Sequence, residues 1–216
     1  MAMDYSEQKN YFETAYNTGS DIWTEKLYRS KVLEYLTALP SNALVLDLGS
    51  GRGRLAFAMA EMGLRVIGIE YIENLVSVNN IEVKAKHLDG KIKFVDGDAL
   101  DISFADGSFD AVTDIGLLQH LHRDDWTKYA SEISRVLKPG GHVVCVSLSR
   151  DTAQFYDFHP KESSDGDYEK YGTYYHFFTP EELSEVYGHD FQIVKQETFY
   201  SEKERENFLI MLLRKN

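Results

Sequence analysis

The residues with the clearest chemical meaning are 45–53, which read Val-Leu-Asp-Leu-Gly-Ser-Gly-Arg-Gly. An apolar strand that carries one acid runs here into glycines at every second position. Glycine has no Cβ and adopts positive φ freely, so its backbone can approach a ligand closely. The run from Leu55 is helical in pattern, and the free amides at a helix start would face whatever lies in the turn. These features predict a nucleotide-like ligand at the carboxyl end of the first strand of an open α/β sheet.

The spacing of the glycines distinguishes two ligands. A dinucleotide-binding turn requires Gly-x-Gly-x-x-Gly, whereas this chain has Gly49, Gly51 and Gly53 and places Arg54 at the third position of that pattern. The series Asp-x-Gly-x-Gly-x-Gly that begins at Asp47 resembles the first motif of the class I S-adenosylmethionine (SAM) methyltransferases. The cofactor of that family has an amino-acid head, and its ammonium group suits an acidic partner such as Asp47.

A second acid, Glu70, ends the next predicted strand, Leu-Arg-Val-Ile-Gly-Ile. An acid at this place can accept hydrogen bonds from both ribose hydroxyls of a nucleoside. A solvated carboxylate at a helix start is the alternative interpretation. The resemblance implies that Tyr71 and Ile72 pack against the adenine ring.

Two further motifs follow in the order that the family shows. Residues 97–99, Gly-Asp-Ala, are similar to a turn whose carboxylate, here Asp98, accepts from the adenine amino group. Its next amide, here that of Ala99, meets the ring. An Asx turn is the structural alternative for Asp98. The run after Phe109-Asp110 is similar to the family's fourth strand, and its end at Asp114 would lie beside the methionine part of the cofactor.

The acceptor half of the site offers a candidate base. A sulfonium is already an activated methyl donor, so the protein has to align an acceptor and exclude water. An oxygen or protonated-nitrogen acceptor also needs a base. The best-placed residue is His120, with His122 two positions on, and a polar surface histidine is the alternative for either. Gln119 could equally orient an acceptor by hydrogen bonding, and the sequence leaves open whether the methyl group goes to O, N, S or C.

Aromatic residues gather in two segments outside the predicted sheet. We expect a single methyltransferase domain over residues 1–216, with an N-terminal helical lid at 1–40 and an aromatic-rich lid insertion at 149–178. In this family such segments fold over the cofactor cleft, where aromatic walls exclude water and stack on a planar or cationic acceptor. Packing of the lid on the sheet is the alternative. The residues are Tyr5, Tyr11, Phe12, Tyr16 and Trp23, then Phe155, Tyr156, Phe158, Tyr168, Tyr171, Tyr174, Tyr175, Phe177 and Phe178.

The alternation of apolar runs predicts the fold class. The first five predicted strands alternate with helices or crossover loops, and a short connection joins the last two as a hairpin. We therefore expect an α/β, doubly wound, mainly parallel seven-stranded sheet of the Rossmann-like methyltransferase type, with the last strand antiparallel. Leu-Lys-Pro-Gly-Gly at 137–141 is similar to a family turn, in which Pro139 ends the helix and the glycines turn the chain. Strands are expected at 43–48, 64–69, 91–95, 109–114, 141–148, 191–199 and 206–213, and helices at 5–17, 22–38, 53–62, 72–87, 123–137 and 180–187.

Composition restricts the partners. The chain has 216 residues, a net charge of −12 and no basic stripe, so a nucleic-acid substrate is not expected. Its single cysteine, Cys145, excludes an internal disulfide and fits a reducing cytoplasm. The sequence has no run of 18 apolar residues, which would predict a membrane span, so we expect a cytoplasmic protein. Asp165 and Asp167 are too few to predict a metal site.

These observations predict a methyltransferase that uses SAM, yields S-adenosylhomocysteine (SAH) and acts on a small molecule. The Phe-Thr-Pro-Glu-Glu-Leu run at 178–183 resembles the helix before the sixth strand in enzymes of the ubiquinone-biosynthesis and tellurite-resistance type. A nicotinamide oxidoreductase is the first alternative, and Arg54 opposes it. A SAM-binding regulatory or scaffold module without catalysis is the second. A protein or RNA methyltransferase, which the net charge disfavours, is the third.

Overall fold

The computed structural model describes residues 3–21, 23, 29–152, 165–201 and 206–216. The predicted lid residues Phe155, Tyr156 and Phe158 lie outside these ranges. The main strands are β1 (Leu44–Leu48), β2 (Arg65–Glu70), β3 (Ile92–Asp96), β4 (Phe109–Ile115), β5 (Leu137–Leu148), β8 (Phe191–Ser201) and β9 (Glu206–Lys215). The helices are α1 (Ser6–Thr18), α2 (Arg29–Leu36), α3 (Arg54–Glu61), α4 (Glu73–Ala85), α5 (Arg123–Val136) and α7 (Pro180–Tyr187), with 3-10 turns η2 (Leu118–His120) and η3 (Gly188–Asp190).

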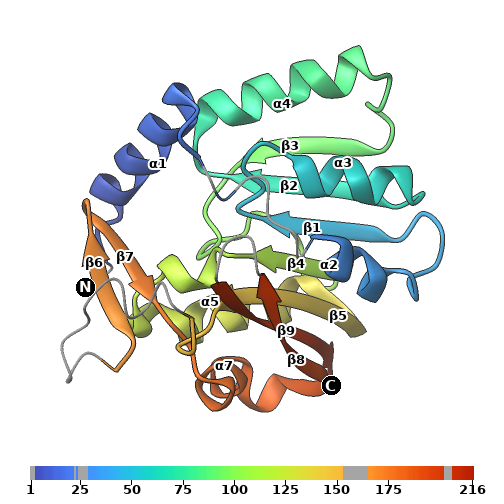
Figure 1. Cartoon of the computed structure of the whole chain (residues 1–216). Helices are drawn as coiled ribbons and strands as arrows, with labels where there is room; N and C mark the ends of the chain where they lie inside the picture. Colours follow the sequence, from blue (N-terminus) through green and yellow to red (C-terminus); the bar gives the residue numbers. More distant parts are fainter. Residues whose placement is uncertain (1–2, 22, 24–28, 153–164, 202–205) are drawn as a thin grey trace.

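The seven strands form one sheet in the order β3-β2-β1-β4-β5-β9-β8 (Figure 1). The first five are parallel to one another, and β9 runs antiparallel between β5 and β8. The order reverses between β1 and β4, so the carboxyl ends of these two strands open a crevice at the edge of the sheet. The predicted fold class and its antiparallel last strand are confirmed.

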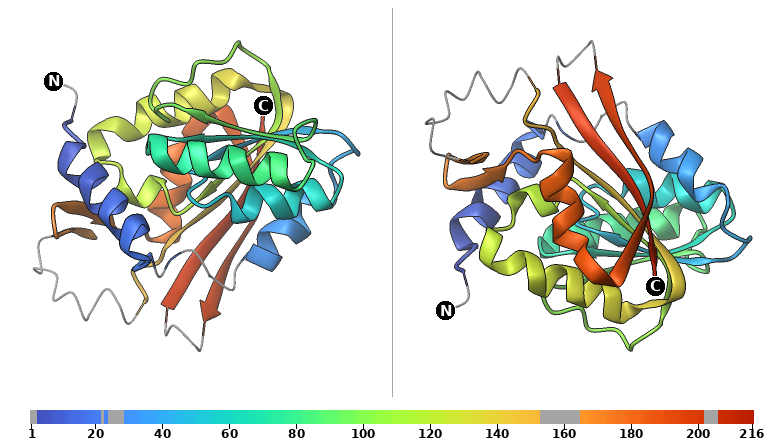
Figure 2. Two further views of the ribbon diagram at one scale, coloured as in Figure 1. Left: turned by 90° about the horizontal axis from the view of Figure 1, so that it is seen from above. Right: turned by 90° about the horizontal axis from the view of Figure 1, so that it is seen from below.

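Helices cover both faces of this sheet (Figure 2). Val45 and Leu46 are neighbours in β1 but belong to different apolar clusters, because successive strand residues face opposite sides. Val32 of α2 and Met59 of α3 pack in the cluster of Val45, and Ile133 of α5 packs in the cluster of Leu46. The middle strands are therefore apolar on both faces, as a parallel sheet between two helical layers requires.

The Leu-Lys-Pro-Gly-Gly segment differs from its prediction as a turn. Helix α5 ends at Val136, before Pro139, and the segment from Leu137 on already belongs to β5. Leu137 pairs with Phe109 of β4, and a register shift follows. The residue before a proline is restricted to extended conformations, so the chain leaves the helix early and enters the sheet.

A second, unpredicted sheet lies at one end of the molecule. It is the hairpin of β6 (Asp167–Lys170) and β7 (Thr173–His176). Tyr171 and Gly172 connect the strands with φ of 56° and 71°, as a two-residue turn of type I′ requires. The segment has no run of apolar alternation, and sequence periodicity therefore did not reveal it.

Helix α1 lies beside this hairpin, near the carboxyl ends of the sheet strands (Figure 1). The Gln8 side chain joins the two: its Nε2 donates to the His120 carbonyl at 3.0 Å, and its Oε1 accepts from the Tyr174 amide at 3.1 Å. The Tyr5 hydroxyl also donates to Asp125 at 2.7 Å. Helix α2 instead packs Val32 into the core beside α3. The segment predicted as an N-terminal lid therefore has two parts, of which α1 lies beside the hairpin and α2 lies on the sheet.

Candidate functional site

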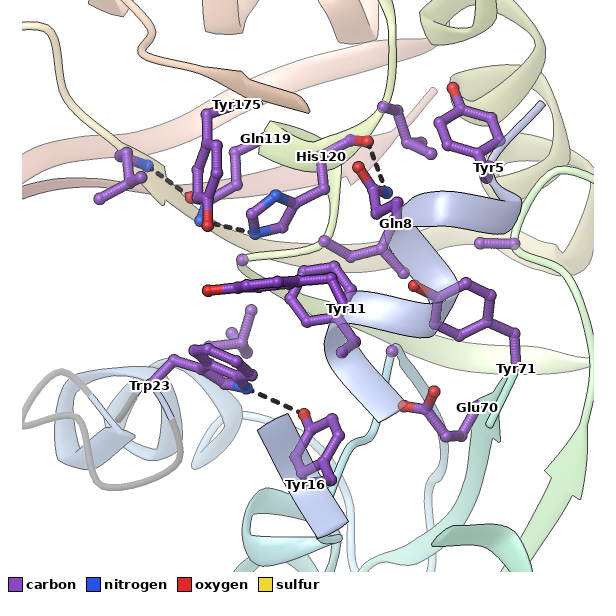
Figure 3. Close-up of a pocket in the computed structure, with 18 of the residues that line it drawn as sticks. Tyr5, Gln8, Tyr11, Tyr16, Trp23, Glu70, Tyr71, Gln119, His120 and Tyr175 are labelled. Atoms are coloured by element: carbon purple, nitrogen blue, oxygen red, sulfur yellow. Dashed lines mark hydrogen bonds between the residues drawn. The ribbon is translucent and has the colours of Figure 1, made fainter. Parts of the chain in front are cut away.

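A cavity of about 430 Å³ lies between the carboxyl ends of the strands, α1 and the β6–β7 hairpin (Figure 3). Three groups of residues form its walls, one from each of these parts of the chain. The N-terminal segment contributes residues that include Tyr5, Gln8, Tyr11, Phe12, Tyr16 and Trp23. Residues at or after the strand ends include Gly49, Glu70, Tyr71, Asp98, Ala99, Ile115, Gly116, Gln119 and His120. The hairpin contributes Lys170, Tyr171 and Tyr175.

The three glycines of the first motif all have positive φ, from 51° to 69°. A Cβ on Gly51 would lie 2.7 Å from the Tyr16 hydroxyl, so this glycine allows a lid residue to close over the turn. A Cβ on Gly53 would lie 2.5 Å from Phe94 in β3. Gly53 lines neither described cavity, and its missing Cβ permits packing of the turn on the sheet; its contact with the cofactor stays a prediction.

Glu70 lies at the end of β2, where its carboxylate faces the glycine turn. Its two oxygens accept from the Gly51 amide at 2.8 Å and the Ile72 amide at 3.1 Å. Burial raises the pKa of Glu70, which is 4% exposed. Tyr71 lines the cavity, whereas the Ile72 side chain is buried and lines neither cavity; the packing of both residues on the adenine stays a prediction.

A second cavity of about 80 Å³ adjoins the first and shares Tyr16 and Gly49 with it. Asp47 lines it, and its carboxylate accepts from the Thr113 hydroxyl at 2.7 Å. Burial raises the pKa of Asp47 to about 7, and the nearby Arg29 opposes this shift. A small cavity lined by a buried acid and by Arg29 suits the two charges of an amino-acid head.

Asp98 and Asp114, the other two predicted acids, differ in whether they line the cavity. Asp98 lines the cavity, and its Oδ1 accepts from the Leu100 amide at 2.8 Å, so the Asx turn and the cavity-facing position coexist. Asp114 is fully buried below the cavity and lines neither cavity. It accepts from the Tyr129 hydroxyl at 2.6 Å and the Leu117 amide at 2.8 Å. In this structure the carboxylate holds the chain that leaves β4, and the contact of Asp114 with the cofactor stays a prediction.

His120 lines the cavity, and both its ring nitrogens have partners. Nδ1 lies 2.9 Å from the Tyr174 carbonyl oxygen, and Nε2 lies 3.3 Å from Nε2 of Gln119. Burial lowers the pKa of His120 to about 4, so the ring is neutral at neutral pH. His122 does not line the cavity and stacks on Tyr174, with ring centroids 4.1 Å apart.

Aromatic lid residues divide between the cavity and the core. Tyr171 and Tyr175 face the cavity together with the five aromatics of the N-terminal segment. Tyr11 and Tyr171 stack with centroids 6.2 Å apart, which joins α1 to the hairpin turn. Phe177 and Phe178 are fully buried in the two apolar clusters, as the packing alternative predicts.

Sequence reasoning did not identify Gln8 or Arg29 as site residues. Gln8 lies among exposed positions of α1, and only the positions of His120 and Tyr174 explain why its side chain is buried. Arg29 begins α2, far in sequence from Asp47. In the part of the chain that the structure describes, no group of three potential metal ligands occurs, and no helix is long and apolar enough to cross a membrane.

Comparison with known proteins finds similarity to methyltransferases. Residues 46–145 match the family described as methyltransferase domain. The match covers somewhat less than half of the chain, and the order of the strands in the sheet is similar to that of class I SAM-dependent methyltransferases.

Particular relatives agree with this class. A demethylmenaquinone methyltransferase of Lactococcus lactis is 35% identical over 133 residues, which are 60% of this chain and 51% of that protein. One from Bacillus cereus is 34% identical over 131 residues, with 59% and 53% covered. The chain thus spans about half the length of the curated relatives it matches.

A solved structure resembles the whole chain in fold. The 1,6-didemethyltoxoflavin-N1-methyltransferase of Burkholderia thailandensis, with bound 1,6-didemethyltoxoflavin and SAH, has a TM-score of 0.83 at 24% identity. The match covers 100% of this chain and 92% of that one. A SAM-dependent methyltransferase of Methanosarcina mazei has a TM-score of 0.74 at 21% identity, with 86% and 96% covered.

Proposed function

We propose that the protein transfers the sulfonium methyl group of SAM to a small-molecule acceptor. One observation carries the proposal: Asp47, Glu70 and Asp98 surround a glycine turn at the switch point of the sheet, and the cavity above them has aromatic walls. This arrangement combines a place for a charged nucleoside with a place for a second, less polar molecule.

The acids have separate roles in holding the cofactor. Asp47 binds the ammonium group of the amino-acid head in the smaller cavity. Glu70 receives the ribose hydroxyls, because its oxygens keep lone pairs beyond the backbone bonds they accept. Asp98, Ala99 and Tyr71 line the part of the larger cavity that takes the adenine.

The chemistry that remains for the chain is alignment and exclusion of water. SAM supplies an activated methyl group, and transfer requires the acceptor lone pair in line with the carbon–sulfur bond. Helix α1 and the β6–β7 hairpin close the cavity on the side away from the sheet (Figure 3). We assign residues 1–40 and 149–178 to this lid within one domain over 1–216, with the α2 part serving as support.

The class of acceptor follows from charge and from the relatives. The matched relatives are methyltransferases whose names specify demethylmenaquinone and 1,6-didemethyltoxoflavin, both small molecules. The net charge of −12 disfavours a nucleic-acid acceptor. We therefore propose a small-molecule acceptor in the cytoplasm.

Calorimetric titration with SAM, SAH and NADH in parallel tests the proposal. We expect the first two to bind and NADH not to bind. Glu70→Gln should weaken SAH binding by about tenfold, whereas Glu73→Gln, a neighbouring acid at the start of α4, should leave it unchanged. Binding of NADH alone, or equal SAH affinity in both variants, would contradict the assignment.

A further inference from the structure

Gln119 and His120 form a hydrogen-bonding edge in the acceptor half of the cavity. Gln119 Oε1 accepts from the Leu148 amide at 2.9 Å, which determines that its –NH2 group faces His120. The carbonyl of Tyr174 can only accept, so His120 Nδ1 carries the ring proton and donates to it. His120 Nε2 is thereby left as the acceptor nitrogen of the ring.

This edge has unused hydrogen-bonding capacity. An amide –NH2 has two hydrogens, and the contact with His120 uses one of them. That contact measures 3.3 Å, which is long for a hydrogen bond. A ligand can replace it at small cost. The edge then offers an acceptor nitrogen on His120 beside an N–H donor on Gln119.

The rings that contact His120 at this edge are aromatic and uncharged. Tyr175 and Phe12 meet the His120 ring edge-on, with centroids 4.7 Å and 5.0 Å away. Among the described lining residues, the charged ones are Glu70, Asp98 and Lys170. Gln119, His120 and Tyr175 lie across the cavity from Glu70 (Figure 3). Aromatic walls of this kind favour a flat ring, and a buried edge without a charged partner disfavours a charged group on it.

We propose that the methyl acceptor is a flat, uncharged ring with an N–H or O–H donor beside a carbonyl or ring-nitrogen acceptor, and that Gln119 and His120 bind this edge. The inference rests on the proposed function and names its substrate class. The donor faces His120 Nε2, and the ligand acceptor receives the N–H of Gln119. His120 is here a positioning residue as well as the predicted base.

Methyl transfer to a ring bound at this edge requires one bond to form, one to break and one proton to leave. A lone pair of the acceptor N or O forms a bond to the methyl carbon, and the carbon–sulfur bond breaks with its electron pair kept by sulfur. The acceptor then carries the positive charge, and its proton passes to His120 Nε2. A methylated ring amide or phenol ether cation is a very strong acid, so even a weakly basic buried imidazole can take this proton.

Two ring compounds and two variants test the inference in protein saturated with SAH. The probes are lumazine, a flat ring with adjacent N–H and carbonyl groups, and 1,3-dimethyllumazine, which lacks both N–H groups. His120→Asn keeps a donor for the Tyr174 carbonyl but removes the Nε2 acceptor. His122→Asn is the matched control, because His122 lies outside the cavity.

We expect calorimetry to show lumazine binding at least about tenfold more tightly than its dimethyl analogue. His120→Asn should remove this preference without changing SAH affinity, and His122→Asn should retain it. Equal binding of the two probes, binding of neither, or an unchanged preference in His120→Asn would overturn the inference while SAH binding still supported the proposed function. Failure of SAH itself to bind would overturn both.

Discussion

Replacement of Gly51 by alanine tests how the lid and the glycine turn depend on each other. Gly51 has φ of 51°, and a Cβ there would lie 2.7 Å from the Tyr16 hydroxyl. That hydroxyl accepts from the indole N–H of Trp23 at 3.0 Å. The Tyr16 side chain must therefore move, and its bond with Trp23 must lengthen or break. Both residues line the two cavities, so the change at Gly51 should reach the ligand.

The magnitude has two parts. A side chain in the left-handed region costs about 1–2 kcal/mol in the free energy of unfolding. Loss of the Tyr16–Trp23 hydrogen bond adds about 0.5–1.5 kcal/mol. Gly107→Ala is the matched control, because Gly107 has φ of 62° and no atom within 4 Å of its Cβ position. The excess loss in Gly51→Ala over this control, about 1 kcal/mol, then reports the displacement of Tyr16.

Urea denaturation measures both free energies, and calorimetry measures the SAH dissociation constant. We expect the constant to rise by at least about tenfold in Gly51→Ala and to stay unchanged in Gly107→Ala. The reasoning would be refuted if the two variants lost equal stability and both bound SAH within a factor of about two of the original protein.

Three further changes address buried groups. Burial raises the pKa of Asp47 to about 7, and a bound ammonium group favours the charged carboxylate. The affinity for SAH should therefore rise with pH until about pH 7. Calorimetry at several pH values should show this rise, and Asp47→Asn should abolish it. Tyr129→Phe removes the donor to Asp114 and should cost about 1.5–3 kcal/mol of unfolding free energy in urea at neutral pH. Because burial raises the pKa of Asp114 to about 6, the loss should shrink below that pH. Thr179→Ala removes the N-cap that accepts from Glu182 at 3.2 Å and should cost about 1 kcal/mol by the same assay.

Each of these three predictions has an outcome that would contradict it. An SAH affinity that is flat from about pH 5 to about pH 8 in the original protein would exclude proton release from Asp47. A Tyr129→Phe loss that is equal at acid and neutral pH would mean that Asp114 does not titrate in this range. For the helix cap, Thr179→Ser should retain the stability that Thr179→Ala loses, and equal losses in both would exclude the capping role.

The sheet and the landmarks of the site follow directly from local sequence. Most strands of the main sheet contain a run of apolar residues, and the helices between them have their own period, so the places of the strands along the chain and the mainly parallel sheet could be predicted. The hairpin at 167–176 could not, because its strands are polar and its stability comes from contacts with α1 and η2. Residues 137–140 were also mispredicted, since pairing with Phe109 continues the strand where a turn was expected.

The sequence by itself determined that acids and glycines would gather at the carboxyl edge of the sheet, because the ends of parallel strands meet there. Only the tertiary structure decided which of them line a cavity. Asp114 lies near the end of its strand as Glu70 and Asp47 do, yet its carboxylate accepts from Tyr129 and lines neither described cavity. The direction of a side chain depends on partners distant in the chain, as when Gln8 is buried by a residue 166 positions away. Local patterns contain no information about such partners.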